Sequence, residues 1–346
     1  MNNSPMSASE SASGSAPGFK LTRRRLVLWT TLLVLAVLPH FFEVIGESYL
    51  TSLFAKIFVY ALVGVSLDLI IGQAGLISFG HAAFFGMGAY VAGVLSHHDA
   101  NQIQLFGWLE ATNNALISWP LAVVVCALLG LVIGAISLRT TGVYFIMITL
   151  ALAQMIYFLV ISVPEYGGED GLSLWYRNQV PGLDLGSDVQ FYYVCLAFLI
   201  AYLIGAIRVS GSSFGLIVRG AKFNAQRMTS LGKPPFRYQL LIFAFSAAGA
   251  GLAGVLMVNL TQYVSPDYLH WNMSGKFLVI VILGGMGTLY GGFYGALILL
   301  GLEEILSNYT DHWHLIIGLI LVVMVLTSRK GMFDSLSGNG REKTLG

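Results

Sequence analysis

The sequence is poor in charged residues: Asp, Glu, Lys and Arg together make up only 10% of its 346 residues. Soluble domains contain about 25%, so the composition argues against a soluble enzyme or binding domain. The formal net charge of +1 gives no support for a nucleic-acid partner. Hydrophobic residues make up 56%, and there are 40 glycines, small residues that let transmembrane helices approach closely. The sequence therefore predicts an all-α integral membrane protein.

Cysteine and catalytic motifs are also scarce. The chain has 2 cysteines, Cys126 and Cys195, each within an apolar stretch, and this predicts two small buried side chains rather than a disulfide framework or a metal site. No Walker A sequence occurs, and no Ser-His-Asp, zinc-type or paired-carboxylate pattern lies within the apolar stretches. We therefore expect no catalytic residues, no metal, no cofactor and no ATP hydrolysis by the Walker A route.

Apolar stretches about as long as a membrane is thick follow one another along the chain. They predict spans at residues 26–45, 50–71, 75–95, 116–138, 142–163, 190–207 and 238–260. Residues 1–25 predict a disordered cytoplasmic tail, and residues 329–346 predict a second cytoplasmic tail. A cleaved signal peptide is the alternative to the first span, but that stretch has the length of a retained helix.

The charges of the loops predict how the chain is oriented. Residues 208–237 contain six basic residues and no acidic one, whereas Pro164–Val189 contains five acidic residues and only Arg177 as a basic one. An excess of Lys and Arg marks short cytoplasmic loops. We therefore expect the first segment inside the cell and the second outside.

The end of the chain requires a stretch that enters the membrane and returns. The C-terminal tail is basic but residues 303–311 are acidic, so residues 275–302 must cross twice. A cluster of glycines breaks this stretch into two short helices, about 275–284 and 288–306, as membrane proteins tolerate. The sequence thus predicts about ten transmembrane helices within residues 26–328, broken ones included, with both termini cytoplasmic.

The basic segment also predicts a short helix. It covers Phe214–Leu231; Ser212 or Ser213 can cap its start, Gly232 can end it, and Pro234-Pro235 prevent its continuation. Such a helix either docks onto a cytoplasmic partner or lies at the membrane surface and contacts only lipid headgroups. Charge and length alone favour neither.

Residues 72–81, GQAGLISFGH, interrupt the apolar sequence with glycines and polar groups. Non-helical backbone at membrane depth is tolerated where protein or a watery cavity receives its polar groups. Gln73, Ser78 and His81 therefore either face a translocation path or bond to neighbouring helices. Asp68, near the inner end of the second span, is a candidate for ion coupling, but we favour a capping or packing role.

Residues 249–254 match the pattern G-x-G-x-x-G. No strand precedes them, so a dinucleotide-binding interpretation lacks its structural context. The small residues four apart, Ala247/Gly251 and Ala250/Gly254, instead predict close contact between helices.

Five stretches, in the same order, resemble the LivM-type permease subunits of bacterial branched-chain amino-acid ABC importers, a likeness that covers about residues 50–330. They are GQAGLISFGHAAFFGMGAYVAGVL (72–95), LRTTGVYFIMITLALAQMIYFLV (138–160), YGGEDGL (166–172), LLIFAFSAAGAGLAGVL (240–256) and SPDYLHWNMSGKFLVIVILGGMGTLYGGFYGA (265–296).

The resemblance implies a multi-pass protein of the bacterial plasma (inner) membrane. Its partners would be two ABC ATPase subunits that bind the ATP, a second homologous permease subunit, an extracytoplasmic solute-binding protein and membrane lipids, with no nucleic acid. The helix at about 213–232 would be the coupling helix that docks on an ATPase. The coupling residues would be Gly215, Arg219, Lys222, Asn224, Gln226, Arg227 and Gly232. The substrate path would be lined by Gln73, Ser78, His81, Tyr144, Thr149 and Gln154.

Two other classes of function remain as alternatives. One is an ion-coupled secondary transporter of small polar solutes with Asp68 and His81 as coupling groups, and the other is a membrane scaffold that transports nothing. Within the importer class the substrate stays open, because importers of urea and aromatic acids use closely related permeases. The sequence does not distinguish an identical second permease from a distinct one, although the resemblance favours a distinct one.

Overall fold

The computed structural model describes residues 31, 34–42, 46, 48–102, 112–182, 184–310 and 312–327. The predicted tails at residues 1–25 and 329–346 lie outside these residues, as do residues 26–30, 32–33 and 43–45 of the predicted span at 26–45. Of that span, residues 34–42 are helical.

The described residues are mainly helical, as the apolar stretches predict. The helices are α2 (Ser48–Leu69), which continues into a π-helical turn (Ile70–Ala74), α3 (His81–Ala100), α4 (Ala115–Ser137), α5 (Val143–Ile161), α6 (Asp188–Gly211), α7 (Ser213–Phe223), α8 (Ala225–Ser230), α9 (Pro235–Thr261), α10 (Trp271–Gly284), α11 (Gly291–Ser307) and α12 (Trp313–Thr327). Two 3-10 helices (Pro164–Tyr166 and Pro266–Leu269) and two short strands, β1 (Leu172–Ser173) paired antiparallel with β2 (Tyr263–Val264), lie in the connections.

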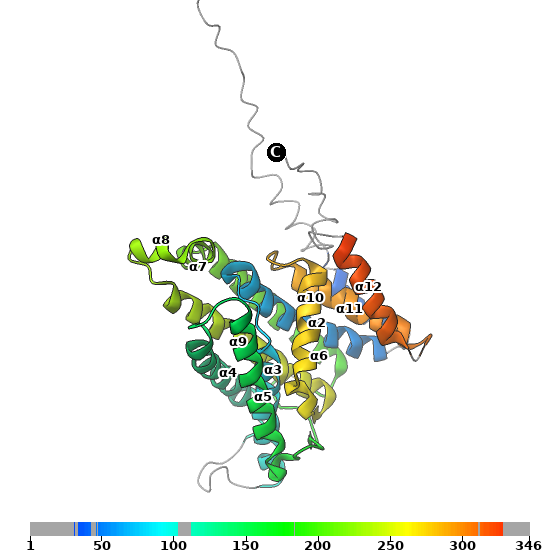
Figure 1. Ribbon diagram of the computed structural model, residues 1–346. Helices are drawn as coiled ribbons and strands as arrows, with labels where there is room; N and C mark the ends of the chain where they lie inside the picture. Colours follow the sequence, from blue (N-terminus) through cyan, green and yellow to red (C-terminus); the bar gives the residue numbers. More distant parts are fainter. Residues whose placement is uncertain are drawn as a thin grey trace, which may run out of the picture.

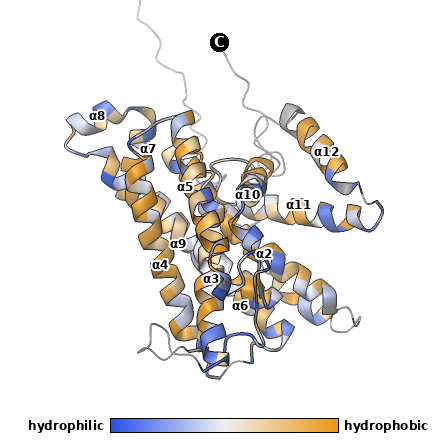
Figure 2. Ribbon diagram, turned by 60° about the horizontal axis from the view of Figure 1, so that its bottom comes forward, coloured by the Kyte–Doolittle hydropathy of each residue, from blue (hydrophilic) through white to orange (hydrophobic). Residues whose placement is uncertain are grey.

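Among the described residues, five segments are long and apolar enough to cross a membrane. They are Tyr49–Ala74, Ala115–Ser137, Val143–Ile161, Asp188–Gly211 and Pro235–Thr261. α2 and α9 form the buried centre: α9 packs against α3 and α4, and α2 packs against α6, α9 and α11. α4 and α5 expose one apolar face each, with Leu128 of α4 and Phe158 of α5 among the exposed side chains. Figure 2 shows the hydrophobic residues along the helices and hydrophilic residues gathered near their ends.

Small residues allow the central helices to meet. A Cβ atom on Gly251 of α9 would collide with Cys126 of α4, and one on Gly254 would collide with the backbone of Phe85 in α3. The prediction that this G-x-G-x-x-G match is a packing surface is therefore confirmed. Both Cys126 and Cys195 are free and buried, as predicted.

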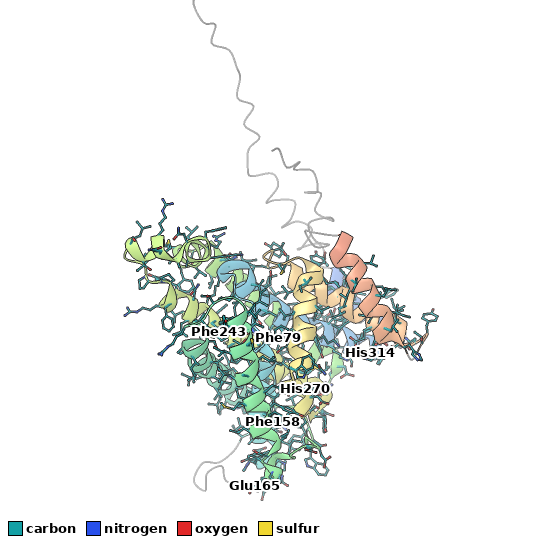
Figure 3. The ribbon with its side chains drawn as sticks, viewed as in Figure 1. Phe79, Phe158, Glu165, Phe243, His270 and His314 are labelled. Atoms are coloured by element: carbon teal, nitrogen blue, oxygen red, sulfur yellow. The ribbon has the colours of Figure 1, made fainter. Side chains whose placement is uncertain are left out.

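The two ends of the helix bundle, both visible in Figure 1, differ in the charge of the segments that lie there. α7, α8 and the turn between α10 and α11 lie at one end, which we call the basic end. The connection between α5 and α6, which carries the acidic residues, lies at the other, which we call the acidic end. Figure 3 shows Glu165 at this acidic end, whereas Phe79 and Phe243 lie nearer to the basic end.

α10 and α11 form the predicted broken pair. α10 ends at Gly284 and α11 begins at Gly291, and the turn between them uses positive φ angles at Gly285 (106°) and Gly287 (83°). Away from the turn the Nζ of Lys276 lies 2.7 Å from the Oε2 of Glu303. This ion pair joins the two helices and keeps them side by side.

Candidate functional site

The break between α2 and α3 is the structural centre of the site. The π-helical turn ends at Gly75, whose φ of 71° is left-handed, a conformation that glycine adopts without strain. Residues 75–80 are then non-helical until α3 begins at His81. π-Helical turns are rare and occur frequently at functional sites. The glycines of this segment thus produce the predicted interruption.

Side chains from two other helices receive the polar backbone of the break. The backbone N–H of Phe79 donates to Thr149 Oγ1 of α5 at 3.3 Å. The hydroxyl of Ser274 in α10 donates to the Phe79 carbonyl at 2.6 Å and accepts from the N–H of Ala82 at 3.0 Å. Ser78 Oγ accepts from the N–H of Gly80 at 3.1 Å. The break is therefore held against α5 and α10.

His81 lies inside the protein, between α3, α9 and α2. Its Nε2 is 2.9 Å from Ser246 Oγ, and the Ser246 hydroxyl donates to the carbonyl of Ser66 at 2.5 Å. Because the single hydroxyl proton of Ser246 is used in that bond, Nε2 of His81 must carry the proton of the His81–Ser246 bond. The His81 side chain is fully buried, and its Nδ1 has no hydrogen-bond partner among the described residues.

The structure brings some of the six predicted path residues together. Four of them have buried side chains in or beside the break: Gln73, Ser78, His81 and Thr149. Gln154, one turn further along α5, is partly buried, and its Nε2 has no partner among the described residues. Tyr144 lies apart from this group with its side chain 73% exposed. That these residues line a substrate path remains a prediction.

Asp68 fixes the turn between α10 and α11. Its Oδ1 accepts from the N–H of Gly287 at 2.5 Å, and its Oδ2 accepts from the N–H of Leu289 at 2.6 Å. The residue is fully buried, and a carboxylate that accepts two backbone N–H bonds is strongly stabilised in its place. The favoured capping or packing role of Asp68 is therefore confirmed.

The basic segment contains two helices, so the prediction of one continuous helix over Phe214–Leu231 is wrong. The break is at Asn224, which has an extended backbone (φ −156°) and whose Oδ1 accepts from the N–H of Arg227 at 2.9 Å. An asparagine in this position caps the start of a new helix. The predicted limits are otherwise correct, since Ser212 caps α7 and Gly232 has a left-handed φ of 74°.

The predicted coupling residues divide into two groups. Arg219 and Lys222 donate to carbonyls of the helix bundle: Arg219 Nη2 to Ser210 of α6 at 2.9 Å, and Lys222 Nζ to Gly72 at 3.0 Å. Gly215 is buried where α7 meets α6. The other four are exposed: Asn224, Gln226, Arg227 and Gly232. Lys222 is exposed as well, so five of the seven predicted coupling residues are accessible to a partner.

Three exposed apolar residues on the helical pair were missed by the sequence analysis. Phe223 is 85% exposed, Leu231 66% and Leu216 61%. The buried face of α7 is made of Gly215, Val218 and Ala221 instead. The sequence did contain a signal for them, because this segment has more large apolar residues than one face of a short helix can bury.

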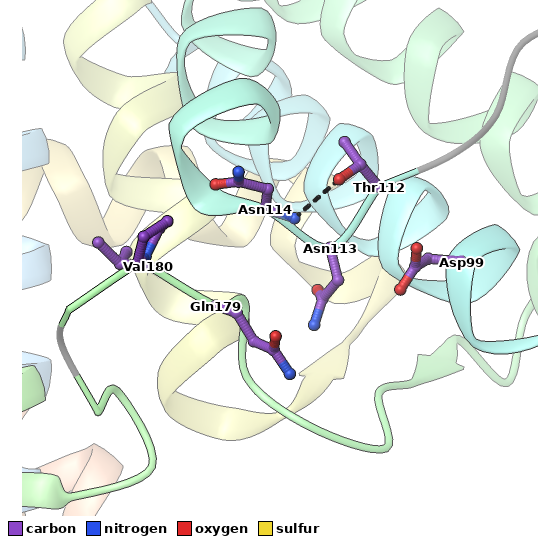
Figure 4. Close-up of a pocket in the computed structure, with 7 residues that line it drawn as sticks. Asp99, Thr112, Asn113, Asn114, Gln179 and Val180 are labelled. Carbon is purple, nitrogen blue, oxygen red and sulfur yellow. Dashed lines mark hydrogen bonds between the residues drawn. The ribbon is translucent and has the colours of Figure 1, made fainter.

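Two cavities lie away from the predicted path residues. One, of about 300 Å³ at the acidic end, is polar and is shown in Figure 4, where the N–H of Asn114 donates to Thr112 Oγ1. The other, of about 410 Å³, is lined by apolar residues of α3, α4 and α5 and by Tyr90 and Tyr166. None of the six predicted path residues lines either cavity. In the part of the chain that the structure describes, no three His, Cys, Asp or Glu side chains gather to hold a metal ion.

Taken together, the apolar helices and the broken segments are those of a multi-pass α-helical membrane protein. The chain belongs to the family described as branched-chain amino acid transport system / permease component, whose model matches residues 49–326. The resemblance found in the sequence is thereby confirmed.

Curated relatives support the same family. The chain is 25% identical over 335 residues to the high-affinity branched-chain amino acid transport system permease protein LivM of Salmonella typhimurium, a match that covers 90% of this chain and 75% of the relative. Identity and coverage are the same for LivM of Escherichia coli. The permease protein LivH of Escherichia coli is 24% identical over 277 residues, or 77% of this chain and 88% of the relative. No solved structure matches the chain.

Proposed function

We propose that this chain is the membrane-spanning permease subunit of an ABC importer for branched-chain or related amino acids. Partner ATPases bind and hydrolyse the ATP, and the permease alternates between conformations open to either side. The family and the names of its curated relatives support this function. The single structural observation that carries it is the basic helical pair α7–α8, which presents exposed residues away from the bundle and is bonded to the broken segment behind it.

The proposal includes a topology. Residues 26–328 form about ten transmembrane helices, short and broken ones included, in the inner membrane of a bacterium. The tails at 1–25 and 329–346 and the α7–α8 pair are cytoplasmic. The excess of basic residues in α7–α8 and of acidic residues in Pro164–Val189 supports this orientation.

The proposal also includes the partners. One of two ATPase subunits docks on α7–α8, a second homologous permease completes the membrane part, and an extracytoplasmic solute-binding protein delivers the substrate. The break at residues 72–81 and the neighbouring face of α5 line the path of the substrate. Two buried polar atoms without a hydrogen-bond partner among the described residues, Gln73 Oε1 and Gln154 Nε2, support this assignment.

A charge reversal on α7–α8 tests the function. We would reconstitute the complete complex in proteoliposomes and replace Gln226 and Arg227, both exposed, together by Glu. ATPase co-purification and ATP-driven amino-acid uptake should both be lost while the permease stays folded. Glu165→Lys, a charge reversal at the acidic end, is the matched control and should retain the ATPase.

Other outcomes identify the two competing functions. Uptake that continues without any ATPase but is lost in Asp68→Asn would identify an ion-coupled secondary transporter. A complete complex that never changes the flux of any amino acid would identify a scaffold. Uptake of urea or an aromatic acid, but of no branched-chain amino acid, would retain the importer and correct its substrate.

A further inference from the structure

Lys222 connects α7 to the break after α2. Its ammonium group donates to the Gly72 carbonyl at 3.0 Å, between residues 150 apart in the sequence. Its aliphatic stem covers Gly75, where an added Cβ would lie 3.0 Å from Lys222 Cγ. The lysine side chain is therefore held twice, because its stem packs on protein and its ammonium group bonds to a helical carbonyl. α7 is thus fastened to the π-helical turn.

The same π-helical turn touches the turn between α10 and α11. A Cβ atom on Gly72 would lie 2.6 Å from the Cα of Gly287, so the two backbones are in direct contact. Gly287 and Leu289 are in turn held by the two carboxylate oxygens of Asp68. We call these five residues, Lys222, Gly72, Asp68, Gly287 and Leu289, the basic-end cluster.

No other side chain of the helical pair makes such a bond to the break. Among the hydrogen bonds of the described residues, Arg219 reaches the end of α6 and Asn224 caps α8, so neither joins α7 to residues 70–80. α7 itself does not need Lys222 for its structure, because Ser212 caps its start and Val218 is buried beneath it.

We propose that Lys222 is a positioning residue for coupling: it passes movement of α7–α8 to the break at residues 70–80 and, through the basic-end cluster, to the turn between α10 and α11. This inference rests on the proposed function, since it requires that an ATPase moves α7–α8. Physical coupling between two sites requires a connected set of contacts that can shift together, and the cluster connects the helical pair to two broken segments of the bundle. Lys222 is exposed, but its role in coupling depends on its bond to the break rather than on contact with the ATPase.

Three variants of the complete complex in proteoliposomes test this role. Lys222→Met keeps the length of the stem and removes the charged donor. Lys222→Arg restores a donor. Lys233→Met makes the same chemical change at an exposed lysine of the same segment. We would measure ATPase co-purification, the amount of amino acid imported per ATP hydrolysed, and hydrogen exchange of the backbone amides at residues 72–80 and 285–290.

We expect Lys222→Met to bind the ATPase normally but to import about tenfold less substrate per ATP, since a hydrogen bond to a charged group is typically worth that factor or more. Exchange should rise in both amide segments, Lys222→Arg should recover most of the import, and Lys233→Met should behave as wild type. A merely structural role would not change the ratio of import to hydrolysis while the ATPase remains bound.

The inference would be overturned, with the importer function intact, by an unchanged import ratio in Lys222→Met or by a loss of ATPase binding that accounts for all the lost import. Unchanged exchange at residues 72–80 would also overturn it, because the contact would then not hold the break. If the proposed function itself were wrong, the result would be different: the wild-type protein would take up amino acids without any ATPase.

Discussion

The acidic end of the bundle is held by a closed group of buried polar side chains. Asn178 Nδ2 donates to Asn113 Oδ1 at 2.6 Å, and Asn259 Nδ2 donates to Asn178 Oδ1 at 2.8 Å. The same Asn178 oxygen accepts from Trp119 Nε1 at 3.1 Å. These residues come from α4, α9 and two connections, and all are less than 10% exposed. We call them the asparagine network.

The basic end is held by single contacts in series instead. Lys222 bonds to one carbonyl, and Asp68 bonds to two neighbouring amides of one turn. Each contact joins only two elements, so a displacement of one element moves the element that is bonded to it. In the asparagine network, by contrast, every movement breaks several bonds at once. From this comparison we expect the acidic end to resist movement and the basic end to transmit it.

The largest effect should come from Asn178→Ala, which removes the centre of the asparagine network. Its replacement leaves Asn113 Oδ1 and Trp119 Nε1 without these partners, and each such buried group costs about 1–3 kcal/mol. Asn259 Nδ2 loses one bond but keeps its bond to the Val255 carbonyl. We expect a stability loss of about 3 kcal/mol or more, measured as a lower thermal unfolding temperature in detergent. Asn272→Ala, at an exposed asparagine, is the control. Equal unfolding temperatures for the two variants would contradict a rigid acidic end.

The sequence predicted the elements of the fold better than their contacts. Glycines and loop charges predicted both the break at residues 72–81 and the returning pair α10–α11, because a missing Cβ and an unequal charge are local properties. The partner of Asp68 was beyond reach: Gly287 lies 219 residues away, and nothing in a single sequence pairs them. The asparagine network was missed for the same reason, since its members lie at positions 113, 178 and 259.

The sequence predicted which residues make up the candidate site, but not the directions in which their side chains point. Lys222 and Arg219 were predicted as coupling residues, and the sequence did not show that both side chains also bond to the bundle. The sequence shows that a helix is basic, but the orientation of each side chain depends on where neighbouring helices end. The break at Asn224 was missed because asparagine interrupts a helix only when its side chain caps the next one.

Asp68→Asn is expected to have the next largest effect. An amide retains one acceptor oxygen, but its NH2 group then faces a backbone N–H, so one of the two bonds to the α10–α11 turn is lost. Charged hydrogen bonds are worth about 1.5–3 kcal/mol, and we expect ATP-driven import to fall by about tenfold or more. The unfolding temperature should fall less than in Asn178→Ala. If the unfolding temperature fell as far as in Asn178→Ala while import was little changed, both ends would be equally rigid.

A smaller effect is expected for Phe223→Ala on the exposed surface of α7–α8. If this side chain is buried by a docked ATPase, its removal should weaken ATPase association by about tenfold, as loss of one aromatic contact at an interface typically does. The permease alone should keep its unfolding temperature, because the ring is 85% exposed. Phe158→Ala, on the exposed face of α5, is the matched control for loss of an aromatic ring. ATPase binding that falls equally in both variants would rule out α7–α8 as the specific docking surface.

The smallest effect should follow from Asn224→Ala, which tests whether the helical pair moves as one unit or two. Loss of a helix cap costs about 1 kcal/mol, and here it removes the bond from the Arg227 N–H to Asn224 Oδ1. Alanine also favours a continuous helix, so α8 should either fray or join α7. Hydrogen exchange should therefore change at residues 225–230 and stay constant in α7, whose start is capped separately by Ser212. Faster exchange that also reached Gly72 would instead mean that α8 takes part in the basic-end cluster, and that the transmitting part of this end is larger than its direct contacts indicate.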